Sequence, residues 1–231
     1  VHWNYLSTMS HRNYEDGGTE AVDAKSWSGE GGFYSFENGH MMLWTRLTNP
    51  AARPIYNQLG RLKQEVGEAR ADTIVNQTRN LCLYPNVYVM DQFSTQIRVL
   101  RPISVNKTEV SIYCFAPKSE SAENRQKRLR QYEDFFNVSG MGTPDDLEEF
   151  RGCQQGYEAR DMRWNDMSRG AAHWMEGPDD YAKGVGMDTI ASGVKPEDEG
   201  LYVHHHKHWI EEMLNAIELE RASHIPVIQK D

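Results

Sequence analysis

The chain has 231 residues, with 25 lysines and arginines, 34 aspartates and glutamates, and a formal net charge of −9. This length allows one large domain with a substantial core, and the acidic, scattered charge argues against nucleic acid as a partner. No run approaches the roughly 18 apolar residues of a membrane span, and we expect neither a membrane partner nor a secretion signal.

The three cysteines, Cys82, Cys114 and Cys153, are far apart, and no Cys-x-x-Cys occurs. An odd number at this spacing suggests neither a disulfide framework nor a thiolate zinc site. We therefore expect reduced cysteines in a cytoplasmic protein.

The first part of the chain predicts a loop followed by a hairpin. Residues 9–32 are rich in glycine, serine and acidic residues, which is typical of an irregular loop, here expected to lie over the site. Asn38-Gly39 is a good turn signal between two apolar runs, residues 33–36 and 41–47, which we expect to be strands. Residues 55–80 have mixed apolar and charged periodicity, which predicts one or two helices.

Three further strands are predicted around residues 82–90, 93–101 and 108–116, where β-branched and aromatic residues are frequent. Because their connections are short, these strands are expected to be antiparallel. Long amphipathic helices are predicted over residues 119–136 and 201–222. The pattern therefore predicts an α+β domain with helices packed on one curved antiparallel sheet.

Two carboxylates, Asp145 and Asp146, fall in the first turn of another predicted helix. Thr143 is predicted as its N-cap and Pro144 as its first helical residue. Carboxylates suit the positive end of the helix dipole, so capping is the simpler interpretation. The alternative is that the pair points into a chemical site, with His2 as its partner.

A histidine cluster runs from His204 to His208. His204 and His208 are four residues apart and would share a helix face, a spacing that a metal site can use. No His-Glu-x-x-His pattern accompanies them, and the solvated start of a helix explains them more simply.

Several short segments occur in an order that points to one family. They are residues 31–40 (GGFYSFENGH), 79–86 (RNLCLYPN), 90–94 (MDQFS), 132–140 (YEDFFNVSG), 164–170 (WNDMSRG) and 198–202 (DEGLY). Together they resemble the catalytic domain of Rieske ring-hydroxylating oxygenase large (alpha) subunits, specifically the benzoate 1,2-dioxygenase group. The likeness covers nearly the whole chain. It implies that residues 1–231 form one catalytic domain with a helix-grip-like fold.

The resemblance implies a mononuclear Fe(II) held by two histidines of an Asp-x2-His-x4-His motif and by a later aspartate. His2 matches the second histidine and Asp146 matches the later carboxylate, so both are implied as catalytic metal ligands. The preceding aspartate and the first histidine are expected upstream of Val1. Two histidines and one carboxylate occupy one face of Fe(II), which leaves adjacent positions open for dioxygen. Asp145 is left as a neighbouring or capping residue.

The family also uses a Rieske 2Fe–2S cluster, which Cys-x-His and Cys-x-x-His segments hold. Neither segment occurs in this chain, so we expect an N-terminally truncated catalytic domain, with the Rieske domain preceding Val1 in the same polypeptide. By resemblance, electrons from NADH pass through a separate flavin-containing reductase to the cluster and then to the iron. The α3β3 assembly that is common in the family implies a small beta subunit and copies of this chain as partners.

The resemblance also suggests substrate-contacting residues. Phe136, Asn137 and Met141 lie just before the Asp pair and are implied as pocket walls, although some of this segment could instead be the buried face of the preceding helix. A benzoate carboxylate needs a cation or several polar hydrogens, because a buried unpaired charge is costly. Arg98 and Arg46 on predicted strands are candidates, and strand alternation could send either to solvent.

The implied activity is that of an aromatic-ring-hydroxylating dioxygenase, which converts benzoate or a substituted benzoate and O2 to a cis-1,2-dihydrodiol carboxylate. Alternatives of the same class are anthranilate, 2-halobenzoate and toluate dioxygenases. An alternative from another class is a non-catalytic domain that binds an aromatic acid without a working iron centre. Iron content and product formation separate the two classes.

Overall fold

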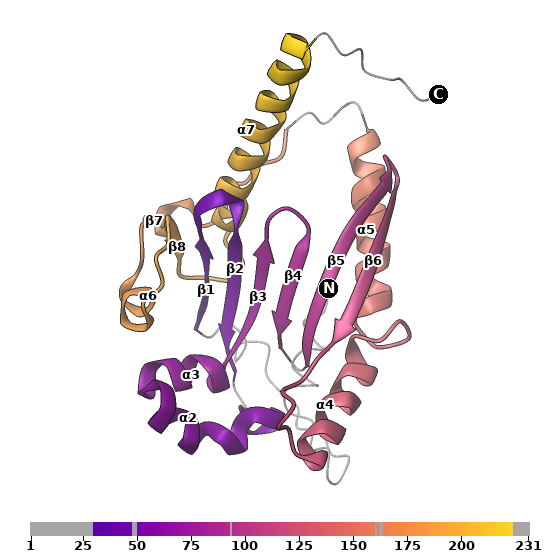
Figure 1. Cartoon of the computed structure of the whole chain (residues 1–231). Helices are drawn as coiled ribbons and strands as arrows, with labels where there is room; N and C mark the ends of the chain where they lie inside the picture. The colour runs from indigo at the N-terminus through magenta and orange to yellow at the C-terminus, as the bar shows by residue number, and fades with distance from the viewer. Residues whose placement is uncertain (1–29, 48–49, 93, 160, 162–163, 224–231) are drawn as a thin grey trace.

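The computed structural model describes residues 30–47, 50–92, 94–159, 161 and 164–223. Their centre is an eight-stranded antiparallel sheet in the order β6-β5-β4-β3-β2-β1-β8-β7 (Figure 1). The strands are β1 (Gly31–Ser35), β2 (Met41–Arg46), β3 (Gln77–Leu83), β4 (Val87–Asp91), β5 (Thr95–Ser104), β6 (Lys107–Cys114), β7 (Met175–Glu176) and β8 (Ala191–Gly193). The predicted α+β class with one antiparallel sheet is confirmed.

Helices lie at both ends of this strand order. They are α2 (Leu59–Val66), α3 (Glu68–Asn76), α4 (Ala122–Phe135), α5 (Thr143–Glu158), α6 (Asp180–Val185) and α7 (Gly200–Ser223), with short 3-10 turns η2 (Glu37–Gly39), η3 (Pro50–Ala52), η4 (Pro54–Gln58) and η5 (Ala171–His173). In Figure 1, α7 lies on the β1–β2 side of the sheet, and α4 and α5 lie on the β5–β6 side. The predicted helices over residues 119–136 and 201–222 correspond to α4 and α7.

The predicted turn at Asn38-Gly39 joins β1 and β2. Asn38 has φ 58° and Gly39 has φ 72°, and this left-handed region is the one that Asn and Gly adopt most readily. The strands on either side pair antiparallel with Phe33 opposite Leu43. The local turn signal therefore places this hairpin correctly.

Two sequence predictions about the middle of the sheet were wrong. Residues 82–90 do not form one strand, because β3 ends at Leu83 and β4 begins at Val87, with Pro85 in the turn between them. Proline has no N–H to give to a sheet ladder, which fits its place in a turn. Gln77–Asn80, predicted as helix, belongs to β3 because this segment pairs with β2, where the Thr45 and Thr78 hydroxyls lie 2.6 Å apart.

The two faces of the sheet carry separate cores. Strand pairing aligns Met41, Cys82, Tyr88 and Arg98 across β2 to β5 on one face, which we call the site face. On this face Phe33, Met41, Cys82 and Leu201 of α7 form one buried cluster. The opposite face is covered by α6, where Tyr34, Met42, Trp44 and Ala182 cluster. Strand alternation therefore decides which side chains can meet α4, α5 and α7.

Arg53 ties the helical end of the domain to the sheet. Its side chain is 6% exposed, and Nη1 donates to the carbonyls of Ile74, Val75 and Gln77 at 2.8, 3.0 and 2.9 Å, where α3 ends and β3 begins. These carbonyls include some that a helix end leaves without an intrahelical partner. Nη2 pairs with Asp91. Burial lowers the pKa of Arg53, and the Asp91 carboxylate opposes that shift.

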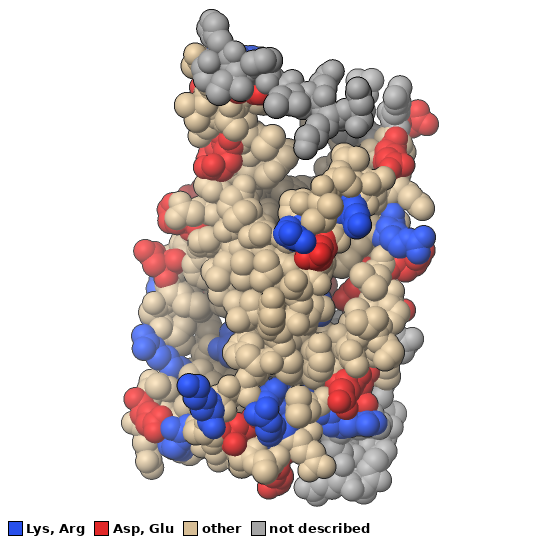
Figure 2. All heavy atoms as spheres, turned by 45° about the vertical axis from the view of Figure 1, so that its right-hand side comes forward, with Lys and Arg blue, Asp and Glu red and all other residues tan. Residues whose placement is uncertain are grey.

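Charged side chains are spread around the periphery of the molecule. Figure 2 shows acidic and basic residues mixed along its lower edge, while uncharged residues make up most of the middle of this view. Among the described residues, no helix is both long and apolar enough to cross a bilayer.

Candidate active site

The start of α5 fixes the position of Asp146. Predicted N-cap Thr143 is not the cap, because the helix begins at Thr143 itself and no side chain caps the preceding Gly142. The Thr143 hydroxyl instead donates to the carbonyl of Phe136 at 2.8 Å, and the Gly142 N–H donates to the carbonyl of Phe135 at 3.0 Å. These bonds tie the start of α5 to the end of α4. A side chain at Gly142 would lie 2.5 Å from the Phe135 ring, so this close approach requires glycine.

An aromatic and thioether cluster surrounds this junction. Phe135 and Phe136 are both 3% exposed, and their rings meet edge to face with centroids 4.8 Å apart. Met90, Tyr132 and Met141 pack against them. The structure therefore brings Phe136 and Met141 together, and their role as pocket walls stays a prediction. Their burial also fits the simpler interpretation, since such side chains form a core whether or not a ring binds beside them.

Asn137 is held by local bonds. Its Oδ1 accepts from the N–H of Val138 at 2.9 Å, and its carbonyl accepts from the N–H of Gly140 at 2.8 Å. A side chain used in this way shapes the turn between α4 and α5. Any contact of Asn137 with substrate remains a prediction.

Arg98 joins the site from β5. It pairs with Tyr88 and Ile112 on the neighbouring strands, so it lies on the site face. Its guanidinium carbon is 5.4 Å from the centroid of the Phe136 ring, and its Nε donates to Gln96 Oε1 at 3.2 Å. Burial lowers the pKa of Arg98, whereas the charge of the Asp146 carboxylate raises it. The predicted cation is thus within reach of the charge of the predicted metal ligand.

Arg46, the other predicted cation, is engaged elsewhere. It donates to both oxygens of Asp72 at 2.9 and 3.0 Å, and Glu30 lies 3.6 Å away. The bonds to Asp72 raise the pKa of Arg46. Arg46 shares its face of β2 with Trp44 and Met42, opposite the site face. It does not belong to the site around Asp146.

Comparison with known proteins identifies the family. The sequence model for the ring hydroxylating alpha subunit (catalytic domain) matches residues 7–215. The chain belongs to this family. Its fold is shared by naphthalene 1,2-dioxygenase from Rhodococcus sp. bound to indole, with a TM-score of 0.70 at 15% identity over 91% of this chain and 50% of that one. A second naphthalene 1,2-dioxygenase with indole in its active site gives 0.65 at 18% identity, over 90% and 48%.

Curated relatives include three ring-acid dioxygenases. The chain is 61% identical to the 2-halobenzoate 1,2-dioxygenase large subunit of Burkholderia cepacia, over 95% of this chain and 48% of the relative. It is 55% identical to the toluate 1,2-dioxygenase subunit alpha of Pseudomonas putida, over 96% and 49%. It is 42% identical to the anthranilate 1,2-dioxygenase large subunit of Acinetobacter baylyi (strain ATCC 33305 / BD413 / ADP1), over 94% and 48%. The chain therefore spans about half the length of these relatives.

The metal site of this ring-hydroxylating catalytic domain is described only in part. Asp146 is half-buried in the first turn of α5, the helix whose start is bonded to the carbonyl of Phe136, and a carboxylate there is a donor that Fe(II) accepts. The predicted partner His2 lies outside the described residues. Within the described part of the chain, no group of three or more His, Cys, Asp and Glu side chains could hold a metal. Asp146 fits one position of the implied ligand set, and His2 stays a prediction.

Two histidines of α7 pack against turns of the sheet. His205 Nδ1 lies 2.9 Å from the carbonyl of Gly39, and the His208 ring meets the Tyr84 ring with centroids 4.7 Å apart. His40 Nδ1 in turn accepts from the N–H of Tyr84 at 2.9 Å. The prediction of a purely solvated helix start was wrong for His205 and His208, because they pack on the β1–β2 and β3–β4 turns.

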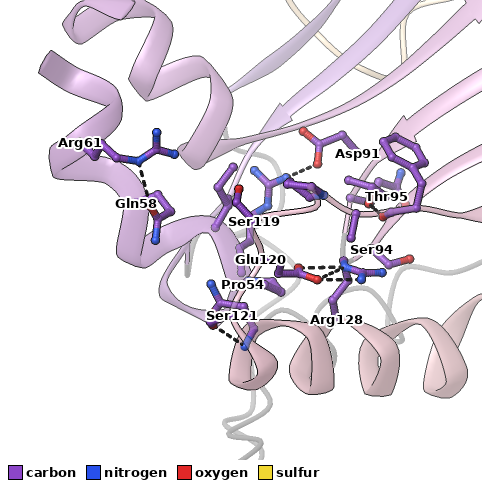
Figure 3. A pocket seen from close by; sticks show the side chains of 17 residues that line it. Pro54, Gln58, Arg61, Asp91, Ser94, Thr95, Ser119, Glu120, Ser121 and Arg128 are labelled. Carbon is purple, nitrogen blue, oxygen red and sulfur yellow. Dashed lines mark hydrogen bonds and ion pairs between the residues drawn. The ribbon is translucent and has the colours of Figure 1, made fainter. Parts of the chain in front are cut away.

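A cavity of about 390 Å³ lies at the other end of α4 (Figure 3). Its walls come from η4, α2, the ends of β4 and β5, and the segment leading into α4, and include Arg53, Asp91, Glu120 and Arg128. Asp146 and the Phe136 cluster do not line it. Sequence reasoning gave these wall residues no role, although Asp91, Gln92 and Ser94 lie in the segment of residues 90–94 that resembles the family. The active site at Asp146 stays a prediction from the family resemblance, and this cavity does not include it.

Proposed function

We propose that this chain is the catalytic domain of a dioxygenase that adds both atoms of O2 to adjacent ring carbons of a benzoate-type acid. The observation that carries the proposal is its 42–61% identity to relatives named for 2-halobenzoate, toluate and anthranilate. These three compounds share a benzene ring with a carboxylate. The product is a cis-1,2-dihydrodiol carboxylate, and the balance requires one O2, an electron pair and two protons.

His2 and Asp146, with a histidine upstream, would hold the iron, and bound Fe(II) would supply the centre that activates O2. The remaining work belongs to the chain. Phe136 and Met141 provide an apolar wall that excludes water from the ring, and the Thr143 bond to the Phe136 carbonyl holds this wall in register with Asp146. When the substrate ring and the Asp146 carboxylate are both held in place, the energy of binding the ring serves to orient it for reaction.

The proposed electron donors and subunits are inferred from membership of the same family. We propose that NADH supplies the electron pair through a separate flavin-containing reductase and a Rieske 2Fe–2S domain. A small beta subunit and further copies of this chain, in an α3β3 arrangement, would complete the enzyme. The length of the relatives, about twice that of this chain, leaves room for such a domain in the same polypeptide.

Product analysis tests the proposal. The purified complex that contains this domain is supplied with reductase, NADH and O2, and with equal concentrations of benzoate, the toluates, 2-chlorobenzoate and anthranilate. We expect cis-dihydrodiol carboxylates from benzoate and the toluates, catechol from any 2-chlorobenzoate or anthranilate that reacts at the substituted carbon, and the highest kcat/KM for benzoate. A second candidate, a 2-halobenzoate enzyme, is favoured by the 61% identity to that relative. Preference for the ortho-halogenated acid would support this candidate; its product would be catechol, because a diol carbon that also bears chlorine expels chloride and the ring then loses CO2. Absence of both diol and catechol from every acid would overturn the dioxygenase proposal.

A further inference from the structure

Arg98 has a hydrogen-bonding group without a partner. Its Nη2 is buried, and no acceptor reaches it within the part of the chain that the structure describes. Its Nε is already used by Gln96, which is 0% exposed and itself donates from Nε2 to the Ser94 hydroxyl at 3.3 Å. The guanidinium is therefore held at Nε, and its Nη2 lacks a hydrogen-bond acceptor.

An unsatisfied buried cation is costly. A buried donor without an acceptor loses its hydrogen bonds to water and gains none in the protein. The free-energy cost of this loss is higher when the group is charged. The Phe136 ring at 5.4 Å favours the cation through its π-face, but a ring face does not replace an oxygen acceptor. An arginine stays charged across the physiological pH range. The charge of the Asp146 carboxylate acts on the guanidinium, but no described oxygen accepts from Nη2. The site is thus complementary to an anionic acceptor at Nη2.

The surroundings define what carries that anion. Met90 and Met141 pack against the cluster of Phe135 and Phe136, so the walls near the guanidinium are apolar and adaptable. A flat apolar body with one carboxylate at its edge matches this combination, and a guanidinium fork matches a carboxylate in geometry. A hydrocarbon ring without a charge would leave Nη2 unpaired.

We infer that Arg98 binds the substrate carboxylate and is the residue that selects aromatic acids over neutral rings. Gln96 is its positioning residue, because it holds Nε and turns the end of the fork toward the ring site. When Arg98 holds the substrate carboxylate, it also fixes which edge of the substrate ring faces Asp146. The same contact therefore favours attack at the ring carbons nearest the substrate carboxylate. This inference rests on the proposed function and assigns its substrate selectivity to one side chain.

The test compares a charged ring with a neutral one of the same shape. Benzoate and benzamide are assayed with the complete enzyme carrying Arg98→Met, Arg98→Lys or, as a matched control, Arg101→Met. Arg101 is on the same strand but on the opposite face, 65% exposed and paired with Glu109. The readouts are the Kd of each compound, the shift in melting temperature that each causes, and kcat/KM for each.

Arg98→Met is expected to lower the benzoate-to-benzamide ratio of affinity and of kcat/KM by about 100-fold, in the range expected when a buried charge loses its partner. Arg98→Lys keeps the charge without the fork and is expected to lower it by about 10-fold. Arg101→Met should leave the ratio unchanged. If Arg98→Met does not fold, Arg98→Lys alone decides the outcome, and an unchanged ratio in either folded variant overturns the inference.

The results that would contradict the proposed dioxygenase activity differ from those that would contradict the role of Arg98. A wild-type enzyme that forms neither diol nor catechol from any ring acid would contradict the activity, while its benzoate-dependent melting shift would still depend on Arg98 if the inference holds. A wild-type enzyme that forms diols, and whose Arg98→Met variant loses benzoate and benzamide binding equally, would keep the activity and overturn the role of Arg98.

Discussion

Arg128 and Glu120 form an ion pair in which both side chains are almost fully buried, 6% and 7% exposed, with Nη2 and Oε2 2.8 Å apart. Arg128 Nε also donates to Oε1 at 3.0 Å, so the pair is bidentate, and Nη1 lies 3.3 Å from Cys114 Sγ at the end of β6. The pair thus connects α4 with the segment before it, as Figure 3 shows beside the cavity, and the contact with Cys114 links both to the edge of the sheet. The hydrogen bonds to Glu120 raise the pKa of Arg128.

Glu120→Gln is expected to destabilise the fold by about 3 kcal/mol, because it leaves the buried Arg128 without its counter-charge. The matched control is Glu148→Gln, whose partner Arg151 is 73% exposed while Glu148 is 76% exposed, and which should cost under about 1 kcal/mol. Urea unfolding at neutral pH measures both variants. Equal losses in the two would show that burial does not set the strength of the first pair.

A buried phenol predicts a change of stability at alkaline pH. Tyr34 is 0% exposed and donates to the Asp179 carboxylate, which also accepts from the N–H of Ala182 at 2.7 Å and so caps α6. Burial, and then the charge of Asp179, raise the pKa of Tyr34 far above its usual 10.0. The folded state therefore keeps this proton after the unfolded state has lost it. The stability from Tyr34 is complete below pH 10 and is lost as pH rises above it.

Tyr34→Phe is expected to cost about 1 kcal/mol at neutral pH through the lost hydrogen bond, and to reduce the loss of stability between pH 10 and 11. Urea unfolding across this pH range measures the slope for wild type and variant. Tyr56→Phe is the control, because Tyr56 is 41% exposed. Identical slopes in wild type and Tyr34→Phe would contradict the assignment of the raised pKa.

Short stretches of sequence predict the turns and helices of this fold that depend only on neighbouring residues. Asn38-Gly39 specifies its own turn, and the helical pattern of α4 needs no distant partner. By contrast, β8 has three residues, Ala191–Gly193, and joins the sheet only because β1 is there to pair with it. The helical prediction ran past Asn76 into β3 for the same reason, since pairing with β2 overrides local propensity.

The candidate site also contains residues that the sequence can mark and residues that only strand pairing can place. Asp146, Phe136 and Met141 lie in one continuous segment, so a sequence motif can mark them together. Whether Arg98 or Arg46 faces Asp146 depends on strand register, because a shift of one residue exchanges the two faces. Pairing of Arg98 with Tyr88 settles this for β5, and no sequence pattern near either arginine carries that information.

The cysteines are predicted to differ in reactivity. Cys82 is 2% exposed, and burial raises its pKa and that of Cys114, so both hold less reactive thiolate at a given pH. Cys153 is exposed on α5. Iodoacetamide at pH 8 should therefore label Cys153 first and Cys82 only after unfolding, as peptide mass spectrometry would show. Labelling of Cys82 at the rate of Cys153 in the folded protein would contradict the buried position of β3.

The two aspartates of α5 provide the sharpest test of the metal site. Asp145 and Asp146 are adjacent, both half-buried and both in the first helical turn, so each carboxylate has a similar effect on the helix dipole, about 0.3–1 kcal/mol. The proposed ligand set uses only Asp146. Asp146→Ala is therefore expected to abolish iron retention and diol formation, whereas Asp145→Ala should keep iron near one per subunit.

Metal analysis of the purified complete enzyme measures iron directly, and thermal unfolding of the same preparations shows whether the fold is intact. Asp146→Asn adds a close isostere, which keeps the shape of the side chain and removes its charge. Because a neutral amide is a much weaker ligand for Fe(II) than a carboxylate, this variant should also lose iron. Iron retained by both Asp146 variants, or lost equally in Asp145→Ala, would show that the carboxylate pair serves the helix and that another residue completes the metal site.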